Sequence, residues 1–326
     1  SLEVNMQEYQ EGNVSHKEFI LMGFSGLKGH RQFLFIPFLL LFLLSLFGNS
    51  LLIISIKTRR TLHSPMYMFI CATACVDLTL PILFVPKMLL GFLFDWNKIS
   101  LLGCLVQMFF VHFFGSFQST VLLWMALDRY VAICIPLRYN DYINSSAFFK
   151  LSAIALLRNG SLVLVVVILA GSLSFCLTNV IDHCFCEHMA LVSLACGNTA
   201  RNSVMGLLAV FCVAIVDGVF IAISYIKIFL AVSNTASGKS RQKAIHTCGT
   251  QLMVISVSYI FAMTAFLAYR IKNSLHPDVH VLISIMYLLF PSCFHPIIYG
   301  IRTKEIREQM LNILHYGKIV PISVEP

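Results

Sequence analysis

The chain has 326 residues, of which 58% are hydrophobic and 12% are charged, and its mean hydropathy is +0.82. Soluble domains carry about 25% charged residues, so this chain has too little polar surface to cover a water-soluble globule. We therefore exclude a soluble protein, and we interpret the net charge of +8 as a signal of membrane topology rather than of nucleic-acid binding.

Seven apolar stretches follow one another along the chain, and each is long enough to cross a hydrocarbon layer of ~30 Å as a helix. Lipid offers the backbone no hydrogen bonds, which favours helices throughout. We divide the chain into an extracellular tail (1–32), a membrane domain (33–301) and a cytoplasmic interfacial helix with its tail (302–326). The predicted spans are Phe33–Ile56, Met66–Leu90, Leu101–Cys134, Ser161–Leu177, Ser203–Leu230, Leu252–Ala268 and Val279–Ile301.

Lysine and arginine predict the orientation of the spans, because cytoplasmic loops are enriched in both. One set of connecting segments contains fifteen of the 23 basic residues, and the alternate set contains the other eight. We expect the richer set in the cytoplasm, which makes the N-terminus extracellular and the C-terminus cytoplasmic. Arg158, just before the predicted fourth span, is assigned to the cytoplasmic set.

Two patterns agree with this orientation. Asn13-Val14-Ser15 is a glycosylation sequon in the predicted extracellular tail. Asn159-Gly160-Ser161 also matches the sequon but is rejected, because the predicted topology places it in the cytoplasm or in the membrane. Disulfides form on the extracellular side. The cysteines predicted there are Cys104, Cys176, Cys184, Cys186 and Cys196. Their pairing is left open by the spacing alone.

Asp128-Arg129-Tyr130, within MALDRYVAICIPLRY (125–139), lies at the inner end of the third span. Charges in lipid are costly and are usually paired or functional, although simple anchoring at the membrane face is an alternative. The other motifs are GNSLLI (48–53), LHSPMYMFICATACVDL (62–78), ISYI (223–226), KAIHTCGTQL (243–252) and PIIYGIRTKEIR (296–307). In this order they resemble odorant receptors of the rhodopsin-like G-protein-coupled receptor family.

The resemblance extends over residues 19–314. The segments NVIDHCFCEHMALVSLACGNT (179–199) and NSLHP (273–277) resemble the class I, fish-like branch of odorant receptors. The resemblance implies an all-α membrane protein, a seven-helix bundle with a short interfacial helix after the seventh span. It also implies two disulfides, Cys104–Cys186 and Cys176–Cys196. The seventh span has no lysine, which excludes a retinal Schiff base.

Arg270, at the outer end of the sixth span, is the main candidate for ligand recognition. Phe266 and Ala262 lie four and eight residues earlier on the same helical face, so the guanidinium would cover a small apolar cavity. Such a cavity suits a short carboxylic acid held bidentately, and the class I resemblance favours that ligand class. The alternatives are an arginine that marks the membrane interface, or an ion pair with Asp182 or Glu187.

The third span is expected to form the opposite wall, with His112 as a hydrogen-bond donor, although a structural packing role is the alternative. The other predicted ligand contacts are Met108, Gly115, Ser116, His188 and Tyr259. A second possibility in the outer loop is a soft-metal site. Its candidate ligands are His183, Cys184, Glu187 and His188, and we favour a loop without metal.

For the inner half, the resemblance implies that Asp128 holds Arg129 in the inactive receptor and releases it toward a G protein. The remaining residues assigned to activation are Asp77, Tyr130, Tyr225, Tyr299 and His295. The chain departs from the family pattern at Gln118, Gln251 and His295, where glutamate, histidine and asparagine are usual. The family holds a sodium ion near Asp77, but these departures argue against sodium here and predict an Asp77–His295 pair. Asp217 in the fifth span is expected to form a structural hydrogen bond.

We interpret the chain as an odorant receptor that binds a small odorant, with a carboxylic acid as the favoured class, and activates a stimulatory heterotrimeric G protein to raise cyclic AMP. Its expected partners are that odorant, the G protein and membrane lipid, without nucleic acid or a cofactor. We expect no enzyme activity and a location in the plasma membrane of sensory cilia. The alternatives are a receptor of the same fold for a neutral or non-odorant molecule, and a transporter or channel.

Overall fold

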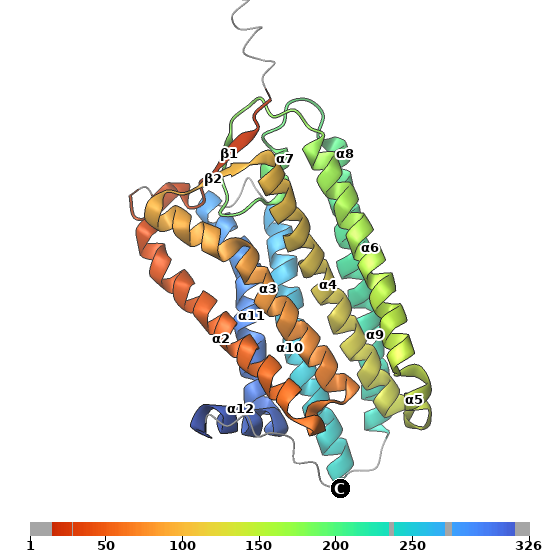
Figure 1. The fold of residues 1–326 in the computed structure, drawn as a ribbon. Helices are drawn as coiled ribbons and strands as arrows, with labels where there is room; N and C mark the ends of the chain where they lie inside the picture. Colours follow the sequence, from red (N-terminus) through yellow and green to blue (C-terminus); the bar gives the residue numbers. More distant parts are fainter. Residues whose placement is uncertain (1–14, 28, 235–237, 271–275, 317–326) are drawn as a thin grey trace, which may run out of the picture.

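The computed structural model describes residues 15–27, 29–234, 238–270 and 276–316, apart from the side chains of Ser145, Lys239, Ser240, Tyr269 and Arg270. Seven helices long and apolar enough to cross a membrane lie side by side in one bundle (Figure 1). They are formed by α2 (Phe35–Thr58), α3 (Pro65–Phe94), α4 (Leu101–Cys134), α6 (Ser145–Gly171), α8 (Ala200–Val210) with α9 (Val216–Ser233), α10 (Lys239–Arg270) and α11 (Pro277–Arg302). The predicted seven-helix fold is confirmed.

Shorter elements connect the spans. The π-helical segment η5 (Phe211–Ile215) joins α8 to α9 into one span. The other connecting elements are η1 (Ser25–Leu27), η2 (Arg31–Leu34), η3 (Arg60–Leu62), η4 (Pro136–Arg138), α5 (Tyr139–Tyr142) and α7 (His188–Val192). After the seventh span, α12 (Lys304–Tyr316) runs across the inner end of the bundle (Figure 1). Ile306 and Met310 of α12 are buried, and Gln309 Nε2 donates to Thr58 Oγ1 of α2 at 3.2 Å.

Local sequence signals explain where several spans begin. Ser100 Oγ accepts a hydrogen bond from Gly103 N at 3.1 Å, and Asn144 Oδ1 accepts one from Ala147 N at 2.9 Å, so α4 and α6 each start at a side-chain cap. Pro65 and Pro277 are the first residues of α3 and α11. A backbone N–H at this position has no acceptor within the helix, so proline, which lacks the N–H, breaks no helical hydrogen bond there.

The predicted start of the fourth span is wrong. Helix α6 begins at Ser145 rather than near Ser161, and it includes both Lys150 and Arg158. These two charges lowered the local hydropathy and made the first half of the helix resemble a cytoplasmic loop. Arg158 therefore belongs to a membrane span, and its assignment to the cytoplasmic set is wrong as well.

A small sheet covers the outer end of the bundle. Strand β1 (Glu18–Leu21) pairs antiparallel with β2 (Lys98–Ser100) and parallel with β3 (Val180–Ile181), in the order β2-β1-β3. It ties the N-terminal segment to the first two outer loops, which contain β2 and β3 (Figure 1). The sequence analysis did not anticipate it, because each strand has four residues or fewer and no alternating pattern of its own.

Two disulfides hold the long outer loop, and they join the pairs that the resemblance implied. Cys104 at the start of α4 is bonded to Cys186, and Cys176 is bonded to Cys196. Cys184 is free and buried, and burial raises the pKa of its thiol well above its ordinary value. A Cβ on Gly23 would collide with the Cys184 sulfur, so the N-terminal segment covers this cysteine closely.

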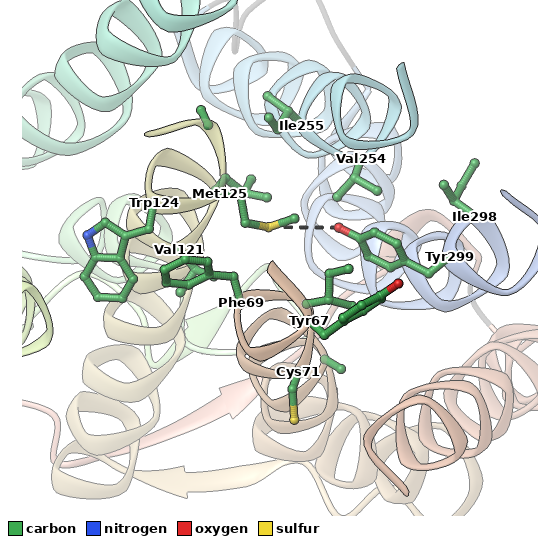
Figure 2. Packing of buried hydrophobic residues seen from close by; sticks show 14 of the residues in the cluster. Tyr67, Phe69, Cys71, Val121, Trp124, Met125, Val254, Ile255, Ile298 and Tyr299 are labelled. Carbon is green, nitrogen blue, oxygen red and sulfur yellow. Dashed lines mark hydrogen bonds between the residues drawn. The ribbon is translucent and has the colours of Figure 1, made fainter. Parts of the chain in front are cut away.

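The inner half of the bundle has a dense apolar core. Figure 2 shows Tyr67 and Phe69 of α3, Trp124 and Met125 of α4, and Tyr299 of α11 around one centre. Tyr299 is 1% exposed, and its hydroxyl donates to Met125 Sδ at 3.9 Å. Helices α2 and α11 also approach closely, since a Cβ on Gly48 would lie 2.9 Å from Pro296 Cγ.

Candidate functional site: an outer cavity above two polar networks

A cavity of about 280 Å³ lies between α4, α6, α7, α8, η5, α10 and α11. Its walls are mainly apolar, with Val111, Val163, Val166, Val210 and Met263 from four of these elements. Its volume is at the small end of the range of roughly 300–1,000 Å³ that is usual for small-molecule sites. The cavity can therefore enclose a small, mostly apolar molecule.

Most of the predicted ligand contacts line this cavity. They are His112, Gly115 and Ser116 of α4, His188 of α7, and Tyr259, Ala262 and Phe266 of α10. Met108 does not: it is 0% exposed and packs in the cluster beneath the outer loop with Cys104 and Cys186. Arg270 ends α10, one turn after Phe266, and its side chain lies outside the described residues.

His112 and His188 bring polar atoms to an otherwise apolar wall. The Nε2 atom of each is buried and has no hydrogen-bond partner within the described part of the chain. Burial, with an added contribution from the nearby His112, lowers the pKa of His188 to about 4. His188 is therefore neutral at pH 7, so it can form hydrogen bonds with a ligand but supplies no charge.

Several residues of the cavity were not among the predicted ligand contacts. They are Glu187 of the loop, Ser258 of α10, Ser284 and Tyr287 of α11, and apolar residues of α6 and α8 such as Leu162 and Leu207. Glu187 Oε2 caps α7 by accepting a hydrogen bond from Ala190 N at 2.7 Å. The residues of α6 that line the cavity lie within the predicted fourth span, but which of them face the cavity depends on how this helix packs against its neighbours.

One polar network below the cavity joins α4, α6 and α9. Asp217 is 0% exposed and accepts hydrogen bonds from Arg158 Nη1 at 2.7 Å and from Nη2 at 2.8 Å. Ser119 Oγ donates to Asp217 at 3.1 Å and lies 2.9 Å from the hydroxyl of Tyr259. Since Ser119 and Tyr259 both line the cavity, the cavity floor contacts a buried ion pair. The expected structural hydrogen bond of Asp217 is thus part of a charged pair.

A second network joins α3, α4, α10 and α11. Asp77 accepts a hydrogen bond from Gln118 Nε2 at 2.6 Å, and its other oxygen lies 2.7 Å from His295 Nδ1. His295 Nε2 lies 3.0 Å from Ser258 Oγ. The structure thus contains the Asp77–His295 contact that the sequence suggested, and Gln118 and Ser258 extend it to the cavity floor.

The inner end holds Arg129 in an ion pair with the adjacent Asp128, which is 0% exposed. Asp128 also accepts a hydrogen bond from the hydroxyl of Tyr139 at 2.6 Å, a contact that the sequence analysis missed. The hydroxyl of Tyr225 donates to Gln251 at 3.3 Å, and Tyr130 is half-buried. The arginine is thus restrained by its carboxylate.

Other predicted features are not assembled into a site. Within the described ranges no group of three or more histidine, cysteine, aspartate or glutamate side chains could hold a metal ion. His183 stacks edge-on against Phe185, with ring centroids 4.4 Å apart. Asn13 lies outside the described residues. Asn159, of the rejected sequon, is fully buried and donates to Thr120 Oγ1 at 3.1 Å.

The bundle, its outer cavity and its restrained inner arginine define a seven-helix membrane receptor. The family model of olfactory receptors matches residues 38–316. Olfactory receptor 52K1 of Homo sapiens is 40% identical over 295 residues, covering 90% of this chain and 94% of that protein. Olfactory receptor 51E2 of Rattus norvegicus is 40% identical over 299 residues (92% and 93%), and olfactory receptor 52P1 of Homo sapiens is 38% identical over 313 residues (96% and 98%).

The chain therefore belongs to the olfactory receptor family, and the predicted class I, fish-like branch is confirmed by these relatives. Members of this family are multi-pass plasma-membrane receptors for small molecules that act with G proteins, and they are not enzymes. Membership of the family also sets aside the transporter or channel alternative.

Proposed function

We propose that this receptor binds a small odorant carboxylic acid in the outer cavity and activates a stimulatory heterotrimeric G protein, which raises cyclic AMP. Sensory cilia are the proposed location, and no cofactor takes part. The observation that carries the proposal is the cavity itself, an apolar chamber with two unpartnered histidine nitrogens. A buried polar atom without a partner costs about 1–3 kcal/mol, which a ligand with oxygen acceptors would recover.

The ligand charge is assigned to Arg270. His188 is neutral at pH 7, because burial lowers its pKa to about 4, so it does not balance a carboxylate by charge. Arg270 follows Phe266 by one helical turn, and Phe266 and Ala262 both line the cavity. An arginine grips a carboxylate through two parallel hydrogen bonds, which lysine cannot reproduce.

The aliphatic part of the ligand would lie against the valines of α4, α6 and α8. Burial of each methylene contributes roughly 0.8 kcal/mol, so affinity should rise with chain length until the small cavity is full. Longer acids would then clash with the walls. A series of acids of increasing length should therefore show an optimum rather than a steady increase.

Signalling is assigned to the inner end of the bundle. A ligand shifts an equilibrium only if it binds the two states with different affinities. The two networks beneath the cavity begin at Ser119, Tyr259 and Ser258, so a ligand at the floor can favour one arrangement of the helices over another. Release of Arg129 from Asp128 would then expose a cation to the G protein.

The test is a cyclic AMP assay in cells that express the receptor, with short acids and their matched alcohols and amides. Arg270→Ala should raise the half-maximal acid concentration by about 10- to 150-fold, the equivalent of about 1.5–3 kcal/mol for a charged hydrogen bond. Lys272→Ala is the control and should leave the response unchanged. Unchanged sensitivity of the Arg270 variant to every active acid would contradict the acid proposal.

A neutral odorant is the second candidate, and the neutral state of His188 favours it. In that case alcohols or esters should activate the receptor, and His112→Ala or His188→Ala should reduce their potency more than Arg270→Ala does. A ligand that activates the receptor without any cyclic AMP signal would contradict the assignment of a stimulatory G protein.

A further inference from the structure

The Asp77 carboxylate is enclosed by protein donors on both oxygens. Asp77 is 0% exposed at the middle of α3, Gln118 Nε2 donates to its Oδ1 at 2.6 Å, and His295 Nδ1 lies 2.7 Å from its Oδ2. Gln118 and His295 are 8% and 1% exposed. The contacts therefore occur in a buried environment where an unbalanced charge would be costly.

His295 is held on both sides of its ring. Its Nδ1 lies 2.7 Å from Asp77 Oδ2, and its Nε2 lies 3.0 Å from Ser258 Oγ. A carboxylate can only accept a hydrogen bond, so Nδ1 donates in the contact with Asp77. The imidazole is thus fixed between α3 and α10 with an N–H directed at the carboxylate.

This arrangement does not fit a sodium ion. A hard cation needs several oxygen ligands, whereas Gln118 presents its amide nitrogen to Asp77, and His295 presents an N–H on the other side. Both carboxylate oxygens of Asp77 are already occupied by nitrogen donors, so the sodium that the resemblance to the receptor family implies does not fit the residues at this site.

We propose that the Asp77 site of this receptor is filled by its own side chains, with nitrogen donors from Gln118 and His295 on the two carboxylate oxygens, and therefore takes no sodium ion. The His295–Asp77–Gln118 contacts hold α3, α4 and α11 together in place of an ion. The proposal is independent of the ligand class, because it concerns the stability of the bundle without an odorant.

The experiment compares thermal unfolding of the purified full-length receptor in sodium chloride and in choline chloride of equal concentration. The wild-type midpoint should be the same in both salts. The double variant Gln118→Glu with His295→Asn restores a second carboxylate and removes the imidazole that occupies one Asp77 oxygen, so it should gain a saturable increase of the midpoint in sodium. Adding Asp77→Asn to the double variant should abolish that increase.

Two results would overturn the proposal. The first is a saturable, sodium-specific shift in the wild type that Asp77→Asn removes, and this arm does not depend on the folding of the double variant. The second is a folded double variant without a sodium response, because Gln118 and His295 would then not be what excludes the ion.

Discussion

Replacing Asp217 with asparagine tests whether the ion pair with Arg158 stabilises the bundle. The substitution keeps the shape of the side chain but removes its charge and one acceptor oxygen. Arg158 would keep a positive charge opposite an amide, in a span where little water is available. Its side chain is 28% exposed, so only part of the lost interaction can be replaced by solvent or lipid headgroups.

The expected loss follows from the contacts. Both Asp217 oxygens accept from Arg158, at 2.7 and 2.8 Å, and Asp217 is 0% exposed. Breaking a buried pair by removing one partner costs about 3–5 kcal/mol. The partial exposure of Arg158 places the expected cost at about 3 kcal/mol, the lower end of that range. At roughly 2–4 °C per kcal/mol, the melting midpoint should fall by about 6–12 °C.

The assay is thermal unfolding of the purified receptor, with Asp95→Asn as the matched control. Asp95 forms the ion pair with Arg31 at 3.1 Å but is 78% exposed, and such surface pairs contribute about 0–1 kcal/mol. The double variant Arg158→Met with Asp217→Asn should be more stable than Asp217→Asn alone, because no unpaired charge remains. Equal losses for Asp217→Asn and Asp95→Asn, or no recovery in the double variant, would refute the reasoning.

Three further outcomes are expected. Burial lowers the pKa of His188 to about 4, so an opened outer loop binds a proton at this residue that the closed loop does not, and this should cost the closed loop about 1.4 kcal/mol per pH unit as pH falls from about 6.5 toward 4. Burial also lowers the pKa of His183 in the same loop, to about 3, so His188→Gln should reduce the pH dependence measured by hydrogen exchange without removing it. Tyr139→Phe removes the hydrogen bond to Asp128, and a hydrogen bond to a charged group contributes about 1.5–3 kcal/mol. The variant should therefore raise basal cyclic AMP, whereas Tyr142→Phe should not. Gly48→Ala places a Cβ 2.9 Å from Pro296 Cγ and should lower the free energy of unfolding by about 1–3 kcal/mol, measured by thermal unfolding. The control Gly238→Ala should be neutral, because a Cβ there would meet no described atom within 4 Å.

The class of protein could be predicted from local properties of the chain. The mean hydropathy over a window of about twenty residues predicts a membrane span wherever apolar, lipid-facing side chains outnumber polar ones in that window. It therefore located five spans closely and placed two starts too late. The fourth span was misplaced where Lys150 and Arg158 interrupt the apolar pattern, and the sixth was predicted to start at Leu252, although α10 begins at Lys239. The same windows could not detect a sheet whose strands are each too short to have a pattern.

The site was only partly accessible from the sequence. Helical spacing placed His112 and Gly115 on one face of α4, and Ala262 and Phe266 on one face of α10, and the structure brings both faces to the cavity. The same spacing also suggested Met108, which packs under the outer loop instead. Spacing fixes which residues share a face of a helix, but the rotation of that helix within the bundle depends on packing with its neighbours.

By itself, the sequence determined that the chain lies in lipid, crosses it seven times as helices, and has the motifs of an olfactory receptor. Only the tertiary structure decided that Arg158 pairs with Asp217, which residues enclose the cavity, and that His295 bonds to both Asp77 and Ser258. The physical reason is that the free energy of placing a helix in lipid is close to a sum over the residues of that one helix, so a single stretch of sequence determines it. A buried charge, by contrast, is stable only beside a partner from another helix, 59 residues away for Arg158 and 218 for His295.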